Sequence, residues 1–305
     1  MEIVSLLFAV LVIVSIFIYY ALNPRYRVLF LTILSCGFIA SYHVNLFIYV
    51  IIYTSINFYL GLKIPDSKFR LTLYRLGLAF NLSQLILLKY ASFAIDPAFQ
   101  LFNLDVQVQN LAKIILPFGI SYFTLQGIGY LINVKMGWEK PERNFVNFLL
   151  YIIFYPKFLS GPIERSNHFL PQLSSLDTMN THKITEGLKI ALVGFFQKTV
   201  IANQLGPLIN NTYSDLSLYS GFDLWAVLLI QPFYLYFDFA GYTNIAIGFA
   251  KIYGIELLPN FNRPFLSENV TTFWKRFHMS LSLWFHDYVF RQFSFKYRKL
   301  GINAA

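Results

Sequence analysis

The longest apolar stretch of the chain, residues 222–253, reads FDLWAVLLIQPFYLYFDFAGYTNIAIGFAKIY and holds only three charged side chains. About 20 predominantly apolar residues are enough for a helix to cross a bilayer. The stretch is too long for one simple crossing, and Pro232 and Gly241 predict a break within it. It therefore predicts membrane-embedded helix rather than the core of a soluble domain.

The rest of the chain has the same apolar character. Of its 305 residues, 56% are hydrophobic and 13% are charged, against about 45–50% and about 25% in an average soluble domain. Such a chain lacks the polar groups to cover a soluble surface, and its composition also excludes a disordered chain. We therefore predict an all-α, polytopic transmembrane protein. Its other apolar runs span residues 3–22, 28–42, 46–62, 71–95, 111–134, 145–159 and 184–202.

Basic residues in the breaks between these runs predict the orientation of the chain. Arg25 and Arg27 follow the first run, and basic clusters also follow the third and the fifth. The breaks after the second and fourth runs are nearly free of Lys and Arg. Because basic loops stay in the cytoplasm, we predict a multi-pass protein of the plasma or inner membrane with its N-terminus outside. These loops account for the net charge of +9, so nucleic-acid binding is not expected.

The two parts of the chain differ in polarity. Residues 1–110 predict a lipid-facing helical scaffold, whereas polar side chains punctuate residues 111–305. Charges near membrane depth are costly unless they face a cavity, a partner or the interface. We therefore place the working core of the protein in residues 111–305. Its charged residues include Lys157, Glu164, Arg165, Lys183, Glu186, Lys189 and Lys198.

The common catalytic signatures are absent from the sequence. The chain has no Gly-x-Ser-x-Gly elbow, no phosphate-binding Gly-rich loop and no His-Glu-x-x-His helix. Its single cysteine, Cys36, excludes a disulfide framework and a cysteine-based metal site. We therefore predict no metal site. Histidine, whose ordinary pKa of about 6.5 suits acid–base work, is the best catalytic candidate.

His278 is the histidine whose neighbours suggest chemistry. Residues 267–290 predict one helix with Ser267 as its N-cap. On that helix Trp274, His278 and Ser282 would share one face, four residues apart. The same pattern fits a helix at the membrane interface, with aromatic anchors and a His278 that is merely hydrogen-bonded. Spacing alone leaves both interpretations open.

Two further residues deserve a place among the candidates. Asp238 lies inside the longest apolar stretch, and a carboxylate at such a position is a functional candidate by default. It could equally make a structural hydrogen bond that fixes a neighbouring break. His168 lies in a loop-like break just after Glu164 and Arg165.

Several blocks of sequence, matched in order, carry a family resemblance. They are LPFGISYFT at 116–124, YPKFLSGPI at 155–163, FDFAGY at 237–242, IAIG at 245–248, NFNRPF at 260–265, FWKRFHMSLS at 273–282 and WFHDY at 284–288. In sequence and spacing they resemble the membrane-bound O-acyltransferases. Within that family the chain is similar to the bacterial branch that includes alginate and peptidoglycan O-acetyltransferases and the D-alanyl transferase of teichoic acid synthesis.

The resemblance implies a multi-helix fold with a tunnel through the membrane. It implies acyl transfer, with acetyl as the first expectation, from acetyl-CoA or another cytoplasmic thioester to hydroxyls of a surface polysaccharide or to a relay protein. Membrane lipid, the donor and the acceptor or relay protein are the implied partners, and no bound cofactor is expected. The family's first active-site polar position falls on His278. Beside it we expect substrate-binding or site-supporting roles for Asp238, Asn262, Trp274, Ser282 and Asp287.

Two departures from the family pattern qualify this expectation. His286 stands where members usually have Arg, directly before Asp287. Members also continue into a helix with a second histidine, usually in a Trp-His-Gly-like motif, and nothing in the 305 residues matches it. We therefore expect a C-terminally incomplete acyltransferase core with little or no transfer activity of its own. The alternatives are D-alanyl transfer from a carrier protein and a non-catalytic membrane scaffold or transport protein.

Overall fold

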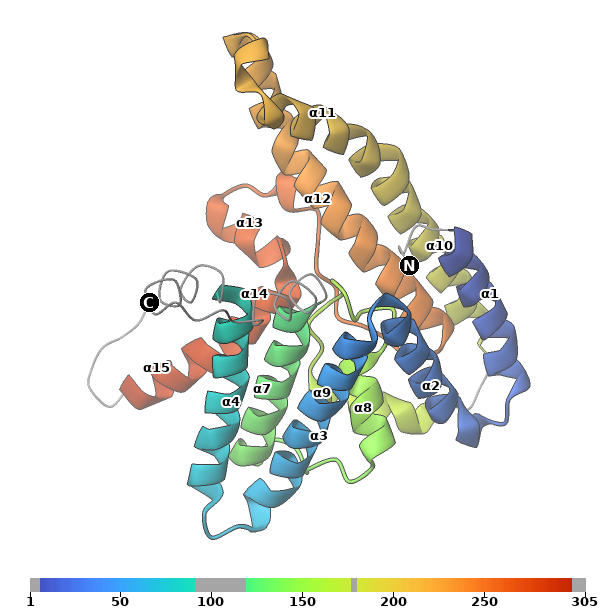
Figure 1. The fold of residues 1–305 in the computed structure, drawn as a ribbon, viewed down its shortest axis with the longest axis vertical. Helices are drawn as coiled ribbons and strands as arrows, with labels where there is room; N and C mark the ends of the chain where they lie inside the picture. Colours follow the sequence, from blue (N-terminus) through green and yellow to red (C-terminus); the bar gives the residue numbers. More distant parts are fainter. Residues whose placement is uncertain (1–5, 91–118, 177–179, 298–305) are drawn as a thin grey trace, which may run out of the picture.

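The computed structural model describes residues 6–90, 119–176 and 180–297, and this part of the chain is helical without any strand (Figure 1). The all-α fold predicted from the sequence is confirmed. The α-helices are α1 (Leu6–Ala21), α2 (Pro24–Tyr42), α3 (Val44–Asp66), α4 (Arg70–Tyr90), α7 (Ile120–Met136), α8 (Phe145–Ile153), α9 (Ser166–Phe169), α10 (Thr181–Phe195), α11 (Asn203–Ser214), α12 (Gly221–Ile252), α13 (Val270–Arg276), α14 (Met279–Phe285) and α15 (Arg291–Tyr297). Two π-helices, η3 (Phe196–Ala202) and η6 (His286–Phe290), and the short 3-10 helices η2 (Leu170–Ser175), η4 (Leu216–Leu218) and η5 (Pro264–Leu266) join them.

Local sequence signals explain where the helices begin. The Asn23 side chain accepts a hydrogen bond from the Arg25 amide at 3.2 Å, and Pro24 occupies the first helical position of α2. Proline suits this position because its missing N–H has no partner there anyway. Ser220 and Asp223 form a reciprocal capping box at the start of α12, which satisfies two otherwise unpaired amides.

Three helices are long and apolar enough to cross a membrane: Val44–Asp66, Arg70–Leu88 and Gly221–Ile252. A shorter apolar helix covers Val10–Ala21. The structure thus agrees with a membrane protein. The apolar run at 145–159 does not form a crossing helix, because α8 has nine residues and ends at Ile153, well below the roughly 20 needed.

The break predicted within residues 222–253 is wrong. α12 runs for 32 residues without interruption and contains Pro232. A proline removes only one backbone hydrogen bond from a helix, and apolar surroundings strongly favour keeping the remaining ones. Gly241 is not a hinge either, since a Cβ there would lie 2.8 Å from the Lys198 amide nitrogen. Gly241 therefore allows two helices to pack closely.

Glycines bring α10 into backbone contact with the C-terminal part of α12. A Cβ added to Gly187 would lie 2.6 Å from the Gly248 carbonyl oxygen, and one added to Gly194 would lie 2.7 Å from that of Gly241. We call these four residues the glycine seam. Small residues at such spacing let the backbones of membrane helices approach closely. The seam explains why α10 and α12 lie side by side in Figure 1.

The remaining helices pack into a second group. α3, α4, α7 and α8 lie together with α2 at one end of the molecule, and α10 to α12 extend from it as a long arm (Figure 1). Buried tyrosines join the two groups, since the Tyr253 hydroxyl lies 2.9 Å from that of Tyr155 and 2.6 Å from Ser15 Oγ. The domain boundary predicted between residues 110 and 111 lies outside the described residues.

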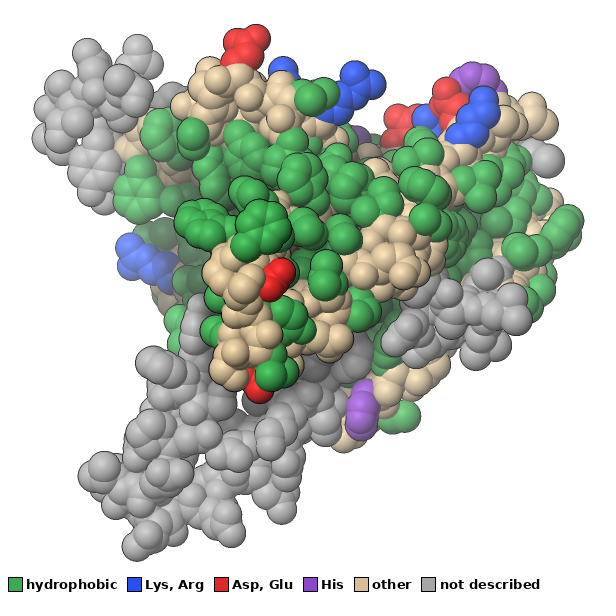
Figure 2. All heavy atoms as spheres, turned by 90° about the horizontal axis from the view of Figure 1, so that it is seen from above, with side chains coloured by type: hydrophobic (Ala, Val, Ile, Leu, Met, Phe, Trp, Pro, Cys, Tyr) green, Lys and Arg blue, Asp and Glu red, His purple; other side chains and the backbone are tan. Residues whose placement is uncertain are grey.

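Much of the described surface is apolar. Figure 2 shows many hydrophobic side chains on the face seen from above, and fewer charged ones. The most exposed large ones include Phe222 at 82%, Leu218 at 77% and Phe17 at 74%. Exposed apolar side chains in this number indicate contact with lipid or with a partner.

Candidate functional site

His278 lies at a sharp corner between α13 and α14. Its backbone has φ 47° and ψ 52°, in the left-handed region. This conformation is uncommon for residues other than glycine. It indicates that contacts from the surrounding structure hold the backbone of His278 in place. The amides of Leu281 and Ser282 both donate to the His278 carbonyl oxygen at 3.1 Å, so a new helix starts directly after the corner.

This corner overturns the prediction of one helix over residues 267–290. The N-cap of α13 is Asn269, not Ser267, and its side chain accepts from the Thr272 amide at 2.8 Å. Trp274, His278 and Ser282 therefore do not share a continuous helical face. The left-handed residue has no local marker in the sequence, which is why helical spacing gave the wrong result.

The His278 imidazole is half-buried among aromatic rings. It meets the Phe239 ring edge to face with centroids 4.7 Å apart. Its Nδ1 atom is buried and has no hydrogen-bond partner in the part of the chain that the structure describes. Burial lowers the pKa of His278 to about 4, because the charged imidazolium is poorly solvated there. The ring is consequently neutral at pH 7, and its buried Nδ1 atom is not paired within the described residues.

Asp238 precedes Phe239 on α12 and forms an ion pair with Lys198 of the π-helix η3. One residue earlier in η3, Gln197 accepts a hydrogen bond from the Asn244 side chain at 2.8 Å. π-helical turns are rare in proteins, but those that occur are often found at functional sites. Asp238 therefore has a structural partner in Lys198. The next residue along α12, Phe239, carries the ring that contacts His278.

Three other predicted site residues, Asn262, Trp274 and Ser282, lie near the corner formed by His278. In the described part of the chain, none of them forms a hydrogen bond with the His278 imidazole. The Asn262 amide donates to the Arg276 carbonyl oxygen at 3.0 Å. Ser282 Oγ donates to the Trp274 carbonyl oxygen at 3.4 Å, and the Trp274 side chain is 58% exposed. These contacts shape the backbone on both sides of His278.

Asp287 lies further along, on the π-helix η6. Its carboxylate is 3.1 Å from the Nδ1 atom of neighbouring His286 and 3.6 Å from Arg165 Nη2. It is thereby connected to a set of buried polar residues that sequence reasoning did not assemble.

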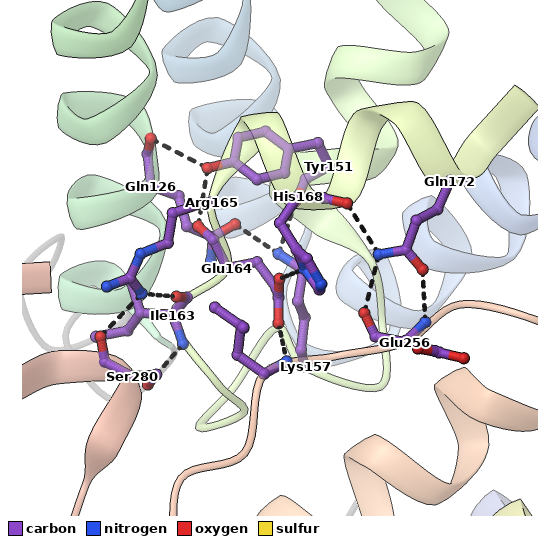
Figure 3. Close-up of polar contacts among 11 residues, drawn as sticks. Gln126, Tyr151, Lys157, Ile163, Glu164, Arg165, His168, Gln172, Glu256 and Ser280 are labelled. Carbon is purple, nitrogen blue, oxygen red and sulfur yellow. Dashed lines mark hydrogen bonds and ion pairs between the residues drawn. The ribbon is translucent and has the colours of Figure 1, made fainter. Parts of the chain in front are cut away.

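That set connects segments that lie far apart in the sequence (Figure 3). We call its members the polar clasp, and they are Gln126, Lys157, Glu164, Arg165, His168 and Ser280. Lys157, Glu164 and Arg165 are all less than one-tenth exposed. Buried charges need partners, and each of these finds them on backbone or side-chain atoms of distant segments.

Lys157 is the most deeply buried of the three. Its Nζ donates to Gln126 Oε1 at 2.5 Å and to the Tyr151 carbonyl oxygen at 2.6 Å. Burial lowers the pKa of Lys157 to about 7. Lys157 thus ties the loop after α8 to α7.

Glu164 joins this loop to the segment after α12. Its Oε1 accepts from the Leu258 amide at 2.5 Å, and its Oε2 lies 2.9 Å from His168 Nδ1. The hydrogen bond to Glu164 raises the pKa of His168. The segment 255–263, which leads to the His278 corner, is therefore anchored at its start.

Arg165 and Ser280 connect the loop to the corner itself. Arg165 Nη1 donates to the Ile163 carbonyl oxygen at 2.8 Å and to that of Ser280 at 2.9 Å. The Ile163 amide donates back to Ser280 Oγ at 3.1 Å. Asn260 adds a third attachment, since its carbonyl oxygen accepts from the Met279 amide at 2.8 Å.

Some of the clasp was visible in the sequence. Lys157, Glu164, Arg165 and His168 were singled out as polar groups in or beside apolar runs, but their contacts could not be assigned. Gln126 carried no signal, because a single amide within an apolar helix has many structural roles.

Comparison with known proteins shows the family to which the chain belongs. A family model described as the membrane-bound O-acyltransferase family matches residues 21–303. A probable alginate O-acetylase, AlgI, of Pseudomonas aeruginosa is 32% identical over 278 residues, which is 90% of this chain and 53% of the relative. The peptidoglycan O-acetyltransferase of Helicobacter pylori is 30% identical, over 89% of this chain and 56% of the relative.

A more local match is to the teichoic acid D-alanyltransferase of Bacillus subtilis. It is 36% identical over 184 residues, or 58% of this chain and 45% of the relative. The chain therefore spans about half the length of the curated relatives it matches. The family match covers most of the chain, and the chain belongs to the membrane-bound O-acyltransferase family.

Proposed function

We propose that this member of the membrane-bound O-acyltransferase family moves an acetyl group from a cytoplasmic thioester to hydroxyls of a cell-surface polysaccharide or to a relay protein. The observation that carries the proposal is His278, a neutral histidine with a buried, unpartnered Nδ1 at a left-handed corner. The similarity to O-acetylases over nine-tenths of the chain supports acetyl as the transferred group.

In this proposal the acceptor hydroxyl oxygen attacks the thioester carbonyl carbon, the carbon–sulfur bond breaks, and the thiol leaves. The proton of the hydroxyl passes through a base to the leaving sulfur. The neutral His278 ring would orient or polarise the carbonyl or the acceptor, and a second histidine, which the family resemblance implies, would serve as the base. Closely packed aromatic rings such as Phe239 would exclude water and so protect the thioester from hydrolysis.

The donor would be acetyl-CoA or another acyl thioester, approaching from the cytoplasm. The basic breaks that follow the first, third and fifth apolar runs support this orientation, with the N-terminus outside. Reporter fusions placed in the described loops would test it, with a cytoplasmic signal expected at Lys68 and Lys140 and an external one at His43.

The test of function uses the protein expressed from its whole reading frame in membranes supplied with labelled acetyl thioester. His278→Ala is expected to lower acetyl transfer at least about 100-fold, a typical contribution of a positioned acid–base or polarising group. His182→Ala is the matched control, since His182 lies on the surface with its side chain 79% exposed. Undiminished transfer in His278→Ala would remove His278 from the chemistry.

A second candidate is D-alanyl transfer from a carrier protein. The local 36% identity to a D-alanyltransferase favours it, although that match covers less of the chain than the O-acetylase matches do. Supplying a D-alanyl-loaded carrier protein in place of acetyl thioester separates the two. A protein that transfers neither group would support a non-catalytic membrane role.

A further inference from the structure

We propose that Arg165 is a positioning residue that holds the His278 corner in its left-handed conformation. The inference concerns the geometry of His278, and its consequence for transfer rests on the function proposed above. Arg165 does not contact the imidazole, so it would act through Ser280 and the backbone between them.

The guanidinium makes three contacts, and those to Ile163 and to Ser280, which lies just after His278, are drawn in Figure 3. Arg165 is 7% exposed, and its Nη1 bonds the carbonyl oxygens of Ile163 and Ser280 at 2.8 and 2.9 Å. Its Nη2 lies 3.6 Å from Asp287. One rigid, planar group therefore connects the loop before α9, the first turn of α14 and the π-helix η6. Both hydrogen bonds come from Nη1, and Nη2 makes no hydrogen bond among the described residues but faces Asp287. A lysine ammonium has a single nitrogen, so it cannot hold the two carbonyl oxygens and face Asp287 from two separate nitrogens.

The residues directly after His278 are held from two further directions. Ser280 Oγ accepts from the Ile163 amide at 3.1 Å, and Ser280 N lies 3.4 Å from Asn260 Oδ1. The Asn260 carbonyl oxygen also accepts from the Met279 amide. A left-handed residue other than glycine persists only where the surrounding structure over-determines it, and these contacts supply that restraint.

Without the restraint, the ordinary conformation of residue 278 is right-handed helical. α13 and α14 would then tend to join into the single helix that the sequence pattern predicts, and the imidazole would leave its edge-to-face contact with Phe239. The ring would enter a more polar environment. Arg165 thus determines where the ring of His278 lies, in addition to any contribution to overall stability.

A direct test follows the titration of the His278 ring by NMR in the protein from its whole reading frame, labelled at histidine and reconstituted in nanodiscs. His278→Gln identifies the resonance. In the native protein we expect an apparent pKa of about 4. Arg165→Lys should move it by at least about one unit toward the ordinary value of about 6.5, because the ring becomes better solvated.

Arg27→Lys provides a matched control. Arg27 is also buried, at 5% exposure, and it also donates from Nη1 to a carbonyl oxygen, that of Leu176 at 2.6 Å. Its replacement should lower the melting temperature without moving the His278 titration. A His278 titration that stays at its native value in Arg165→Lys, or that moves equally in Arg27→Lys, would overturn the proposal.

A kinetic readout extends the test to transfer. Arg165→Lys is expected to lower kcat at least tenfold per folded molecule with a less than threefold change in KM, and Arg27→Lys to leave both near native values. The NMR titration needs no turnover. If Arg165→Lys moves the titration while His278→Ala keeps full transfer, the positioning role stands and the proposed function fails. If the titration does not move, the positioning role fails whatever the transfer activity.

Discussion

The glycine seam and the polar clasp hold distant segments together by opposite means. In the seam, α10 and α12 meet backbone to backbone, since the space at Gly187, Gly194, Gly241 and Gly248 admits no side chain. In the clasp, buried charges bond to carbonyl, amide and side-chain atoms of other segments. The seam depends on volume and carries no charge, whereas the clasp depends on donors, acceptors and protonation.

This difference has a physical origin. Lipid tails are as apolar as leucine, so apolar contact alone gives membrane helices little reason to associate, and close packing becomes the main attraction. Loops such as 154–165 carry backbone groups that are not paired within a helix. Unpaired buried polar groups are costly, so a loop in the interior requires polar side chains, and the clasp provides them.

The largest expected effect on the unfolding free energy comes from a substitution in the glycine seam. Gly194→Ala would place a Cβ 2.6 Å from the Ile245 amide nitrogen and 2.7 Å from the Gly241 carbonyl oxygen. Backbone atoms cannot yield as side chains do, so we expect a loss of about 3 kcal/mol in unfolding free energy, equal at pH 6 and pH 9. Equilibrium unfolding in detergent measures it.

Gly37→Ala is the control for this change. Gly37 lies inside α2, and a Cβ there meets nothing within 4 Å. The same substitution should therefore stabilise the protein by about 0.5–1 kcal/mol, since alanine is the better helix former. Equal effects at the two positions would contradict the packing explanation.

The second largest expected effect on the unfolding free energy comes from a substitution of Lys157 in the polar clasp. Lys157→Met removes the donor to Gln126 Oε1 and to the Tyr151 carbonyl oxygen, and we expect a loss of about 2 kcal/mol near pH 9. The folded pKa is about 7 and the unfolded one about 10.4, so the unfolded state binds more protons between them. Native stability should rise with pH across this window.

The change of unfolding free energy with pH distinguishes the buried Lys157 from an exposed lysine. In Lys157→Met the rise in unfolding free energy between pH 7 and pH 10 should be reduced, so the deficit of the variant grows with pH. Lys68→Met, at an exposed turn, should keep the native slope and change stability by no more than about 0.5 kcal/mol. A native slope in Lys157→Met would contradict the lowered pKa.

The third effect concerns protonation of His168. The raised pKa of His168 comes first from its hydrogen bond to Glu164, so this stabilisation is present below about pH 6.5 and is lost as pH rises through the folded pKa. Glu164→Gln should therefore cost more at pH 5.5 than at pH 8, and solvent screening at the 39% exposed His168 side chain should keep the difference below about 1 kcal/mol. Thermal unfolding across this range measures it.

Glu186→Gln offers the comparison on the surface. His182 and Glu186 have the same four-residue spacing as Glu164 and His168, but with side chains 79% and 41% exposed. Solvent screens such a pair, so the same substitution should show much less change between pH 5.5 and 8. A larger pH dependence in Glu186→Gln than in Glu164→Gln would reverse the comparison.

The smallest expected effect on stability is at Arg263, a residue that belongs to neither the glycine seam nor the polar clasp. Arg263 is the other non-glycine residue with positive φ in the described chain, also at 47°. Arg263→Gly should relieve this conformation and raise the unfolding free energy by at most about 1 kcal/mol. Lys275→Gly, within α13, should instead lower it by a similar amount. Loss of stability in Arg263→Gly would indicate a role for its side chain.

The helical elements could be predicted from the sequence because apolar runs of this length have few alternatives in a membrane. The runs at 28–42 and 46–62 correspond to α2 and α3. α12 was predicted with a break at Pro232 that does not exist, because the sequence does not show that apolar surroundings outweigh one missing hydrogen bond.

The candidate site was less accessible to sequence reasoning. His278 and Asp238 were chosen because of their residue type and family resemblance, but the corner at His278 depends on contacts from Asn260 and Arg165. These partners lie 18 and 113 residues away along the chain. No local pattern encodes such a restraint, so spacing predicted a continuous helix instead.

The length of α12 has a mechanical consequence. Its 32 residues extend about 48 Å at about 1.5 Å per residue, while the hydrocarbon layer is about 30 Å thick and helices tilt by about 20° on average. The helix must project, tilt steeply or deform the surrounding bilayer. Because Phe239 lies on α12 and contacts His278, we expect a change in lipid chain length to alter the tilt of α12 and with it the position of this contact.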